Sequence, residues 1–172
     1  EEAEMNEQAS HHVGERTHLH DLHDLSRGDI EALIESARSF HEVNLRPVRK
    51  LPTLRGKTVV TYFFENSTRT KSSFDLAAKR LSADILSFNP SSSSLSKGET
   101  FYDTVKTIDA MAADVVVIRH SAPGASHFVA RHTSAAVINA GDGMRAHPSQ
   151  ALLDAYTIHS KLGRIEGLKV AI

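Results

Sequence analysis

The chain has 172 residues, the size of one ordinary domain, and 40% of them are hydrophobic, as in folded globular proteins. Twenty Lys and Arg nearly balance 21 Asp and Glu, so no overall positive field favours nucleic acid or an anionic membrane as a partner. The absence of Cys excludes disulfides, thiolate nucleophiles and Cys-ligated metal sites. No apolar stretch approaches the ~18 residues of a membrane span, and no signal-peptide pattern is visible, so we expect a soluble, cytoplasmic protein.

The N-terminal part of the chain predicts a tail followed by one helix. Residues 1–17 are acidic and lack apolar periodicity, so we expect a mobile tail. Ser26 is a typical helix-capping residue, Asp29 stands three residues later, and apolar residues follow at helical spacing. This pattern predicts an amphipathic helix over about 26–43.

Several histidines near the N-terminus raise the question of a metal site. Their spacing offers no matching carboxylate geometry, so we expect adventitious metal binding or none. The histidines within the first 41 residues are His11, His12, His18, His20, His23 and His41.

The rest of the chain alternates between buried strands and helices. We expect strands at about 58–64, 84–89, 114–119, 135–139 and 168–172, and helices at about 68–80, 100–111, 124–132 and 147–161. Strands separated by helices imply right-handed crossovers between parallel strands. The predicted fold class is therefore α/β, an open parallel β-sheet with helices on both faces.

The carboxyl ends of parallel strands are where ligands bind in such sheets, and the first strand is followed there by a polar segment. Ser67, Thr68, Arg69 and Thr70 lead into a helix whose first N–H groups and dipole favour an anion. Three hydroxyls and a guanidinium at this place suit a phosphate without a Gly-rich loop. The same residues would also suit an ordinary helix cap with a solvated Arg69.

Two further segments bring polar groups to the same edge of the predicted sheet. Arg119 and His120 follow four apolar residues, although an Arg in this place is often an ion-pair partner. His147 and Gln150 are three residues apart at a helix start and can face the same spot, although His147 would also serve as a cap. Together these groups favour electrostatic binding of an anion and polarisation of a carbonyl over covalent catalysis.

Four segments in this order resemble the aspartate carbamoyltransferase family. They are STRT at 67–70 after FFEN, KGET at 97–100, IRH at 118–120, and GDGMRAHPSQ at 141–150 followed by ALLD. The resemblance runs from about Leu22 to Ile172 and is specific to the carbamoyl-phosphate-binding domain of the catalytic chain. It implies the aspartate/ornithine carbamoyltransferase-like fold and transfer of a carbamoyl group from carbamoyl phosphate to L-aspartate in pyrimidine biosynthesis, without a metal or organic cofactor.

The resemblance also implies a role for each matching residue. Ser67, Thr68, Arg69 and Thr70 would hold the phosphate, and Arg119, His147 and Gln150 would hold and polarise the carbamoyl end. Arg69, Thr70, Arg119 and His147 would be the catalytic groups, and Ser94 and Lys97 would enter the active site of a neighbouring subunit in a homotrimer. A regulatory or dihydroorotase-like chain is a further candidate partner of such a trimer.

The chain departs from the family pattern in two mild ways and one serious way. Lys71 stands where Arg is frequent, and Ser149 stands where Thr is common. We expect residues 18–165 to form the carbamoyl-phosphate domain and 166–172 the first strand of a missing aspartate-binding domain, so efficient catalysis by this chain alone is not expected. The alternatives are an ornithine carbamoyltransferase, whose HPSQ counterpart usually contains Cys, and a non-catalytic assembly chain.

Overall fold

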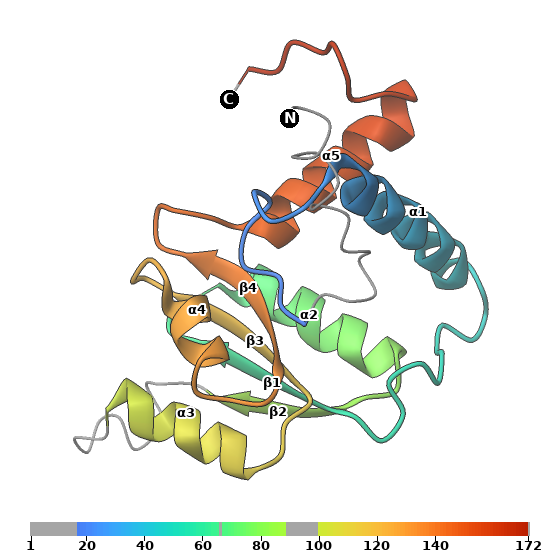
Figure 1. The fold of residues 1–172 in the computed structure, drawn as a ribbon. Coiled ribbons are helices and arrows are strands. Elements are labelled where there is room, and N and C mark those ends of the chain that lie inside the picture. The colour runs from blue at the N-terminus through green and yellow to red at the C-terminus, as the bar shows by residue number, and fades with distance from the viewer. Residues whose placement is uncertain (1–16, 66, 89–99, 172) are drawn as a thin grey trace, which may run out of the picture.

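The fold is built on a four-stranded parallel sheet, seen in a computed structural model that describes residues 17–65, 67–88 and 100–171 (Figure 1). All the strand pairs are parallel, and the spatial order is β2-β1-β3-β4. The predicted α/β class with a parallel sheet is confirmed. The strands are β1 (Thr58–Phe63), β2 (Asp84–Phe88), β3 (Val115–His120) and β4 (Ala136–Asp142).

Helices cover both faces of this sheet. Figure 1 shows α3 and α4 on one face and α2 and α5 on the other, with α1 packed beside α5. None of the helices in the described part of the chain is long and apolar enough to cross a membrane. The helices are α1 (Arg27–Asn44), α2 (Thr68–Arg80), α3 (Phe101–Ala110), α4 (Ala125–Ala130) and α5 (Pro148–Leu162).

The central strand β1 is buried on both faces, which explains its continuous run of apolar and β-branched residues. Val60 and Tyr62 are fully buried and pack in one cluster with Ile108 of α3. Phe63 points to the opposite face and packs in a second cluster with Ala78 of α2. Because successive side chains of a strand point to opposite faces, each helix layer takes every second residue of the strand.

Helices α1 and α3 begin with the same local device, a reciprocal capping box. The hydroxyl of Ser26 accepts a hydrogen bond from the backbone N–H of Asp29 at 3.2 Å, and the Asp29 carboxylate accepts from the backbone N–H of Ser26 at 2.9 Å. Thr100 and Asp103 repeat this arrangement at the start of α3. The predicted cap at Ser26 is confirmed, and α1 spans Arg27–Asn44.

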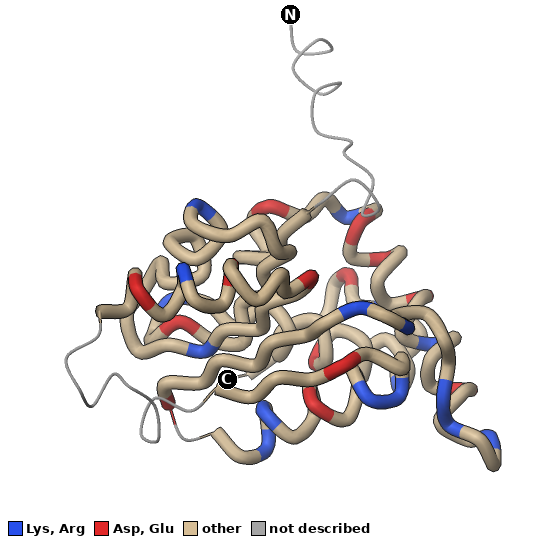
Figure 2. Tube along the Cα trace, turned by 90° about the horizontal axis from the view of Figure 1, so that it is seen from below, with Lys and Arg blue, Asp and Glu red and all other residues tan. Residues whose placement is uncertain are grey.

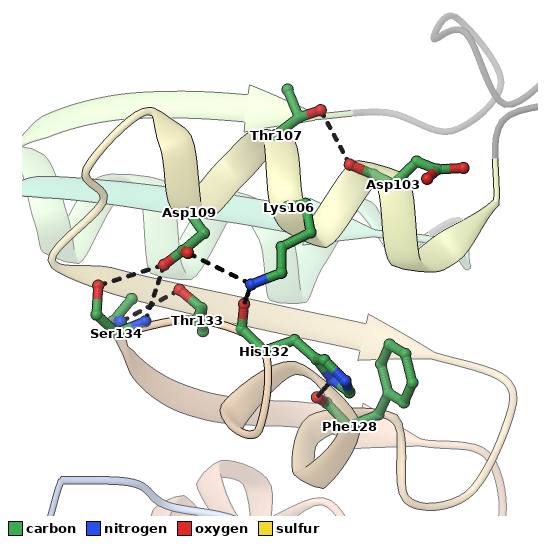
Figure 3. Close-up of polar contacts among 9 residues, drawn as sticks. Asp103, Lys106, Thr107, Asp109, Phe128, His132, Thr133 and Ser134 are labelled. Carbon is green, nitrogen blue, oxygen red and sulfur yellow. Dashed lines mark hydrogen bonds and ion pairs between the residues drawn. The ribbon is translucent and has the colours of Figure 1, made fainter.

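The outer helix α3 is fastened to the loop before β4 by polar contacts (Figure 3). The Asp109 carboxylate accepts from the backbone N–H and the hydroxyl of Ser134 at 2.9 and 3.3 Å. Lys106 Nζ donates to the backbone carbonyl of His132 at 3.1 Å. The Ser134 N–H is the largest cause of the lowered pKa of Asp109. These contacts hold the C-terminal end of α3 against the loop that leads into β4.

Two segments differ from the sequence-based expectations, and a third lies almost wholly outside the described residues. Residues 168–171 of the expected last strand form no strand, because within the described chain no neighbouring strand pairs with this exposed segment after the Gly167 turn. Strand β4 continues beyond the expected end at Asn139 as far as Asp142. The expected tail falls almost wholly on 1–16, outside the described residues.

The free edge of β4 is covered by the extended segment 17–20. Leu19 donates its N–H to the Val137 carbonyl at 2.8 Å and accepts from the Asn139 N–H at 2.9 Å. His18 Nδ1 accepts from the Val137 N–H at 3.1 Å. The segment therefore acts as a short additional strand and satisfies backbone groups that an edge would expose. No described residues form a cluster of three or more side chains that could hold a metal, His18 and His20 included.

Candidate active site

The N-terminus of α2 lies at the carboxyl end of β1. Ser67 is the N-cap residue, but its side chain caps no backbone N–H of the helix. Its hydroxyl instead donates to Thr70 Oγ1 at 2.9 Å. The first-turn N–H groups of a helix have no acceptor within the helix itself. With Ser67 turned to Thr70, these N–H groups remain suited to an external anion.

The exposure of the side chains in this turn divides them into two groups. Thr68 and Arg69 are exposed, whereas Ser67 and Thr70 are half-buried. The alternative of an ordinary Ser cap does not hold, because Ser67 makes no capping hydrogen bond. The alternative of an exposed Arg69 does hold in this structure. A guanidinium in that place can reach an anion at the helix start without breaking a buried contact.

Arg119 lies beside the end of β1 and is held there by two hydrogen bonds. The register of the sheet pairs Arg119 with Phe63. Arg119 Nε donates to the Glu65 carboxylate at 3.0 Å, and its Nη1 donates to the Ala140 carbonyl at 3.2 Å. The ion-pair alternative for Arg119 is therefore realised, and the side chain is still 24% exposed.

The neighbouring His120 reaches the same edge of the sheet but the opposite face. Its ring packs against Phe64, with ring centroids 4.2 Å apart, and against Phe101 of α3. Burial lowers the pKa of His120. The expectation that Arg119 and His120 share an edge is correct, but the pleat of β3 sends only Arg119 toward the α2 face.

His147 is the N-cap of α5, and its ring geometry fixes where its proton lies. Nδ1 accepts from the Gln150 backbone N–H at 3.3 Å and lies 3.2 Å from the Ser149 hydroxyl. Because a backbone N–H only donates, Nδ1 carries no proton, and the neutral ring holds its proton on Nε2. Burial, followed by the charge of Arg119, lowers the pKa of His147 and so favours this neutral form. His147 is thus both a cap and a hydrogen-bond donor at Nε2.

Gly141 is the point at which Arg119 and His147 converge. A β-carbon on Gly141 would lie 2.8 Å from Arg119 Nη1 and 3.5 Å from His147 Cδ2. Gly141 also has a φ of +124°, which L side chains rarely adopt. The sequence suggests this glycine only as part of a tight turn, whereas the structure shows that it clears space for two functional side chains.

Gln150, another expected site residue, does not join Arg119 and His147 in this structure. The Gln150 side chain is exposed and donates to Asp154 at 2.9 Å, along its own helix. Ser94 and Lys97 lie outside the described residues. Glu65, which sequence reasoning assigned no role, is the partner of Arg119, and its position directly after β1 was the available signal.

Elsewhere among the described residues, neither the charge distribution nor the groove between α1 and α5 indicates a second anion site. Figure 2 shows basic and acidic positions distributed over the described part of the trace. A groove of about 690 Å³ lies between α1 and α5, but its lining contains both Arg and Glu side chains and none of the expected site residues. The carboxyl end of the sheet, where Arg119 and His147 converge on Gly141 and where α2 begins after β1, is therefore the best candidate site in the described chain.

Comparison with known proteins identifies the family of this chain. Residues 17–160 match the family model described as aspartate/ornithine carbamoyltransferase, carbamoyl-P binding domain. The chain is 62% identical over 152 residues to the aspartate carbamoyltransferase catalytic subunit of Desulfosudis oleivorans, covering 88% of this chain and 49% of the relative. The corresponding subunit of Halothermothrix orenii is 58% identical, with 88% and 48% covered. The chain spans about half the length of these curated relatives.

Solved structures give the same result for the fold. Aspartate transcarbamoylase from Trypanosoma cruzi in complex with carbamoyl phosphate superposes with a TM-score of 0.81 at 39% identity, covering 87% of this chain and 48% of that one. The catalytic subunit of M. jannaschii aspartate transcarbamoylase also has a TM-score of 0.81 at 39% identity, with 89% and 50% covered. The resemblance seen in the sequence is confirmed, and the chain belongs to the aspartate/ornithine carbamoyltransferase family through its carbamoyl-phosphate-binding domain.

Proposed function

We propose that this chain binds carbamoyl phosphate and forms the carbamoyl-phosphate half of an aspartate carbamoyltransferase. The reaction transfers the carbamoyl group to L-aspartate and gives N-carbamoyl-L-aspartate and phosphate, a step of pyrimidine biosynthesis. One observation carries the proposal, namely the convergence of Arg119 and His147 on Gly141 at the sheet edge where α2 begins. The names of the relatives and the carbamoyl phosphate complex of the T. cruzi structure support it.

The first turn of α2 suits the phosphate end of the substrate. Its N–H groups and the positive end of the helix dipole favour a dianion. The hydroxyls of Ser67 and Thr70 already lie 2.9 Å apart and can turn toward phosphate oxygens, and Thr68 adds a third hydroxyl. Arg69 is exposed and can add a charge-assisted hydrogen bond, so we assign these four residues to the phosphate.

Arg119 and His147 suit the carbamoyl end. His147 offers Nε2–H, and Arg119 retains N–H donors beyond the two that hold Glu65 and Ala140. When the amine nitrogen attacks the carbonyl carbon, negative charge grows on the carbonyl oxygen. As the C–N bond forms, the bond between carbon and the phosphate oxygen breaks, and the proton lost by the amine leaves with the phosphate as hydrogen phosphate. Each donor aimed at that oxygen contributes about 2.7 to 4 kcal/mol in comparable sites, and we also assign Thr70 to this group.

The remaining parts of the proposal extend beyond the described site. Gln150 would turn its amide from Asp154 toward the carbamoyl group, and Ser94 and Lys97 would complete the site of a neighbouring copy in a cytoplasmic homotrimer. Because the chain spans about half the length of its relatives, we assign the groups that hold the carboxylates of L-aspartate to the other half. Near-normal turnover by the 172-residue chain alone would contradict this assignment.

Calorimetric titration with carbamoyl phosphate, or with a stable phosphonate mimic, tests the proposal. The parent is compared with R69A and with R55A, which removes an equal charge from an exposed position before β1, at the opposite edge of the sheet. We expect saturable binding that R69A weakens by about tenfold or more, because one charge-assisted hydrogen bond is lost, and that R55A leaves unchanged. Light scattering of the same samples reports whether the binding species is a trimer. Equal binding by R69A and the parent, or no binding by a folded trimer, would reject the proposal.

A further inference from the structure

The first turn of α2 is fastened to the sheet by a closed ring of hydrogen bonds. The ring joins Thr61 of β1, Asp75 and Lys71 of α2, and Ser87 of β2. Its four contacts are Thr61 Oγ1 to Asp75 Oδ1 at 3.0 Å, Lys71 Nζ to Asp75 Oδ2 at 2.6 Å, Lys71 Nζ to Ser87 Oγ at 2.9 Å, and Ser87 Oγ to Thr61 Oγ1 at 3.0 Å.

The direction of every hydrogen bond in this ring follows from its donors. Thr61 has one hydroxyl proton and gives it to Asp75, so Ser87 must donate to Thr61. Ser87 in turn accepts from Lys71, whose ammonium also donates to Asp75. Lys71 is therefore the only member of the ring that donates two of its hydrogen bonds, and the Asp75 carboxylate is the only member that accepts two.

Apolar packing does not fasten this turn. Within the described residues, the two core clusters take Phe74 and Ala78 from α2 and nothing from residues 68–71. Thr61, in contrast, is fully buried, and Ser87 belongs to the neighbouring strand. The ring thus connects the turn that carries the anion-binding groups to two strands at once. Because Thr61 is fully buried, leaving its hydroxyl without a partner would be costly, which favours the closed ring.

The charge of Lys71 has an unusual place on the helix. A cation in the first turn opposes the helix dipole, which favours negative charge there. The i, i+4 contact with Asp75 compensates for this cost, and both side chains are mostly buried, with 31% and 21% exposed. The presence of a lysine at position 71 is therefore explained by its hydrogen bonds to Asp75 and Ser87.

We propose that Lys71 is a positioning residue for the anion site. Through Asp75, Thr61 and Ser87 it holds the first turn of α2 at the angle at which the donors of Ser67–Thr70 converge on one ligand. The proposal rests on the proposed function, because the ligand used to test it is carbamoyl phosphate. Lys71 itself is assigned no contact with that ligand.

The test compares the parent with K71M, K71R and K79M. K71M removes the ammonium that donates to Asp75 and Ser87, whereas K71R keeps the charge and can still donate to both. K79M removes an equal charge from an exposed position in the last turn of the same helix. Calorimetry gives the affinity for carbamoyl phosphate. Hydrogen exchange at the amide of position 71, which donates to the Ser67 carbonyl at 3.0 Å, reports the order of the turn without any ligand.

We expect K71M to weaken carbamoyl phosphate binding by about tenfold and to accelerate exchange at position 71 by a similar factor, because the turn loses its polar anchor. K71R should restore both values to within about threefold of the parent, and K79M should change neither. Equal losses in K71M and K79M would overturn the proposal, because they would show an effect of charge alone. Unchanged binding in K71M would overturn it as well.

Two further outcomes, a K71M variant that does not fold and a parent that does not bind carbamoyl phosphate, each have their own test. If K71M does not fold, S87A replaces it, because Ser87 is exposed and its loss opens the ring while the Lys71–Asp75 pair remains. S87A is then expected to weaken binding by about threefold, and unchanged binding would overturn the proposal. If the parent does not bind carbamoyl phosphate, the proposed function fails. The exchange measurement then decides on Lys71 alone, with unchanged exchange in K71M overturning its role.

Discussion

Gly141 and Arg119 are so close that a β-carbon on the glycine would lie 2.8 Å from Nη1 of the arginine. The guanidinium is held in place through its Nε by the Glu65 carboxylate at 3.0 Å. Arg119 therefore has little freedom to retreat from a side chain at position 141. The position of Arg119, which we propose contacts the substrate, thus depends on the absence of a side chain at Gly141.

This relationship predicts the effect of G141A. The new methyl group must displace Arg119 and adopt an unfavourable φ, so we expect a loss of about 2 to 4 kcal/mol in the free energy of unfolding, from overpacking and backbone strain together. Carbamoyl phosphate binding should weaken at the same time. G163A is the matched control, because Gly163 also has a positive φ, of +71°, but a β-carbon there would meet nothing within 4 Å. Denaturant melts that show equal losses for both variants would contradict the close approach.

The double role of His147 predicts different effects for two substitutions. Asn is a favourable N-cap, so H147N should keep most of the stability of α5 but lose the Nε2–H donor. H147A should lose both, with a cost of about 1 kcal/mol in the free energy of unfolding from the missing cap. We expect both variants to bind carbamoyl phosphate about tenfold more weakly, as the loss of a ligand hydrogen bond predicts. Calorimetry and thermal melts on the same samples separate the two roles, and normal binding by H147N would remove His147 from the ligand site.

The N-terminal segment over the β4 edge predicts a pH dependence of stability. The His20 ring lies on His127 of α4, with ring centroids 4.1 Å apart. Burial is the main cause that lowers the pKa of His20 to about 4, with His127, His18 and Arg145 acting in the same direction and Asp24 opposing them. The folded chain therefore takes up this proton less readily than the unfolded chain. The stability is complete above about pH 6.5 and is lost as the pH falls toward about 4.

A comparison of melts at about pH 7.5 and about pH 5 measures this effect, which we expect to be about 1 kcal/mol because water partly screens the half-buried ring. H20F keeps an aromatic ring against His127 but cannot take up a proton, so its loss of stability on acidification should be smaller than that of the parent. H23F, at an exposed position in the same segment, is the control. An H20F variant that is as acid-sensitive as the parent would show that His20 does not cause the effect.

The capping box of α1 predicts a change in stability that leaves the site intact. S26A removes the hydroxyl that accepts from the Asp29 N–H and should lower the free energy of unfolding by about 1 kcal/mol. Because Ser26 caps a helix that contributes nothing to the candidate site, carbamoyl phosphate affinity should not change. Melting and titration of one preparation test both statements. A parallel loss of affinity would mean that general destabilisation weakens the site, and the variants above would need to be compared at equal stability.

Local patterns in the sequence were sufficient for most of the secondary structure. The β-branched run of β1, the spacing of apolar residues in α1 and the capping residue Ser26 act through neighbours in the chain, and the structure agrees with them. The expected strand at 168–172 was wrong over its described part, because a strand needs a partner and strand propensity alone supplies none.

The sequence by itself determined the order of the strands and helices, the family, and the arrival of polar residues at one sheet edge, because these depend on local propensity and on the direction of parallel strands. Only the tertiary structure decided that Arg119 and His147 meet across Gly141, and that Lys71 connects α2 to two strands. Both arrangements join residues from elements that are separate in the sequence. They depend on distances of a few ångströms, which register and packing set only when the whole sheet and its helices assemble.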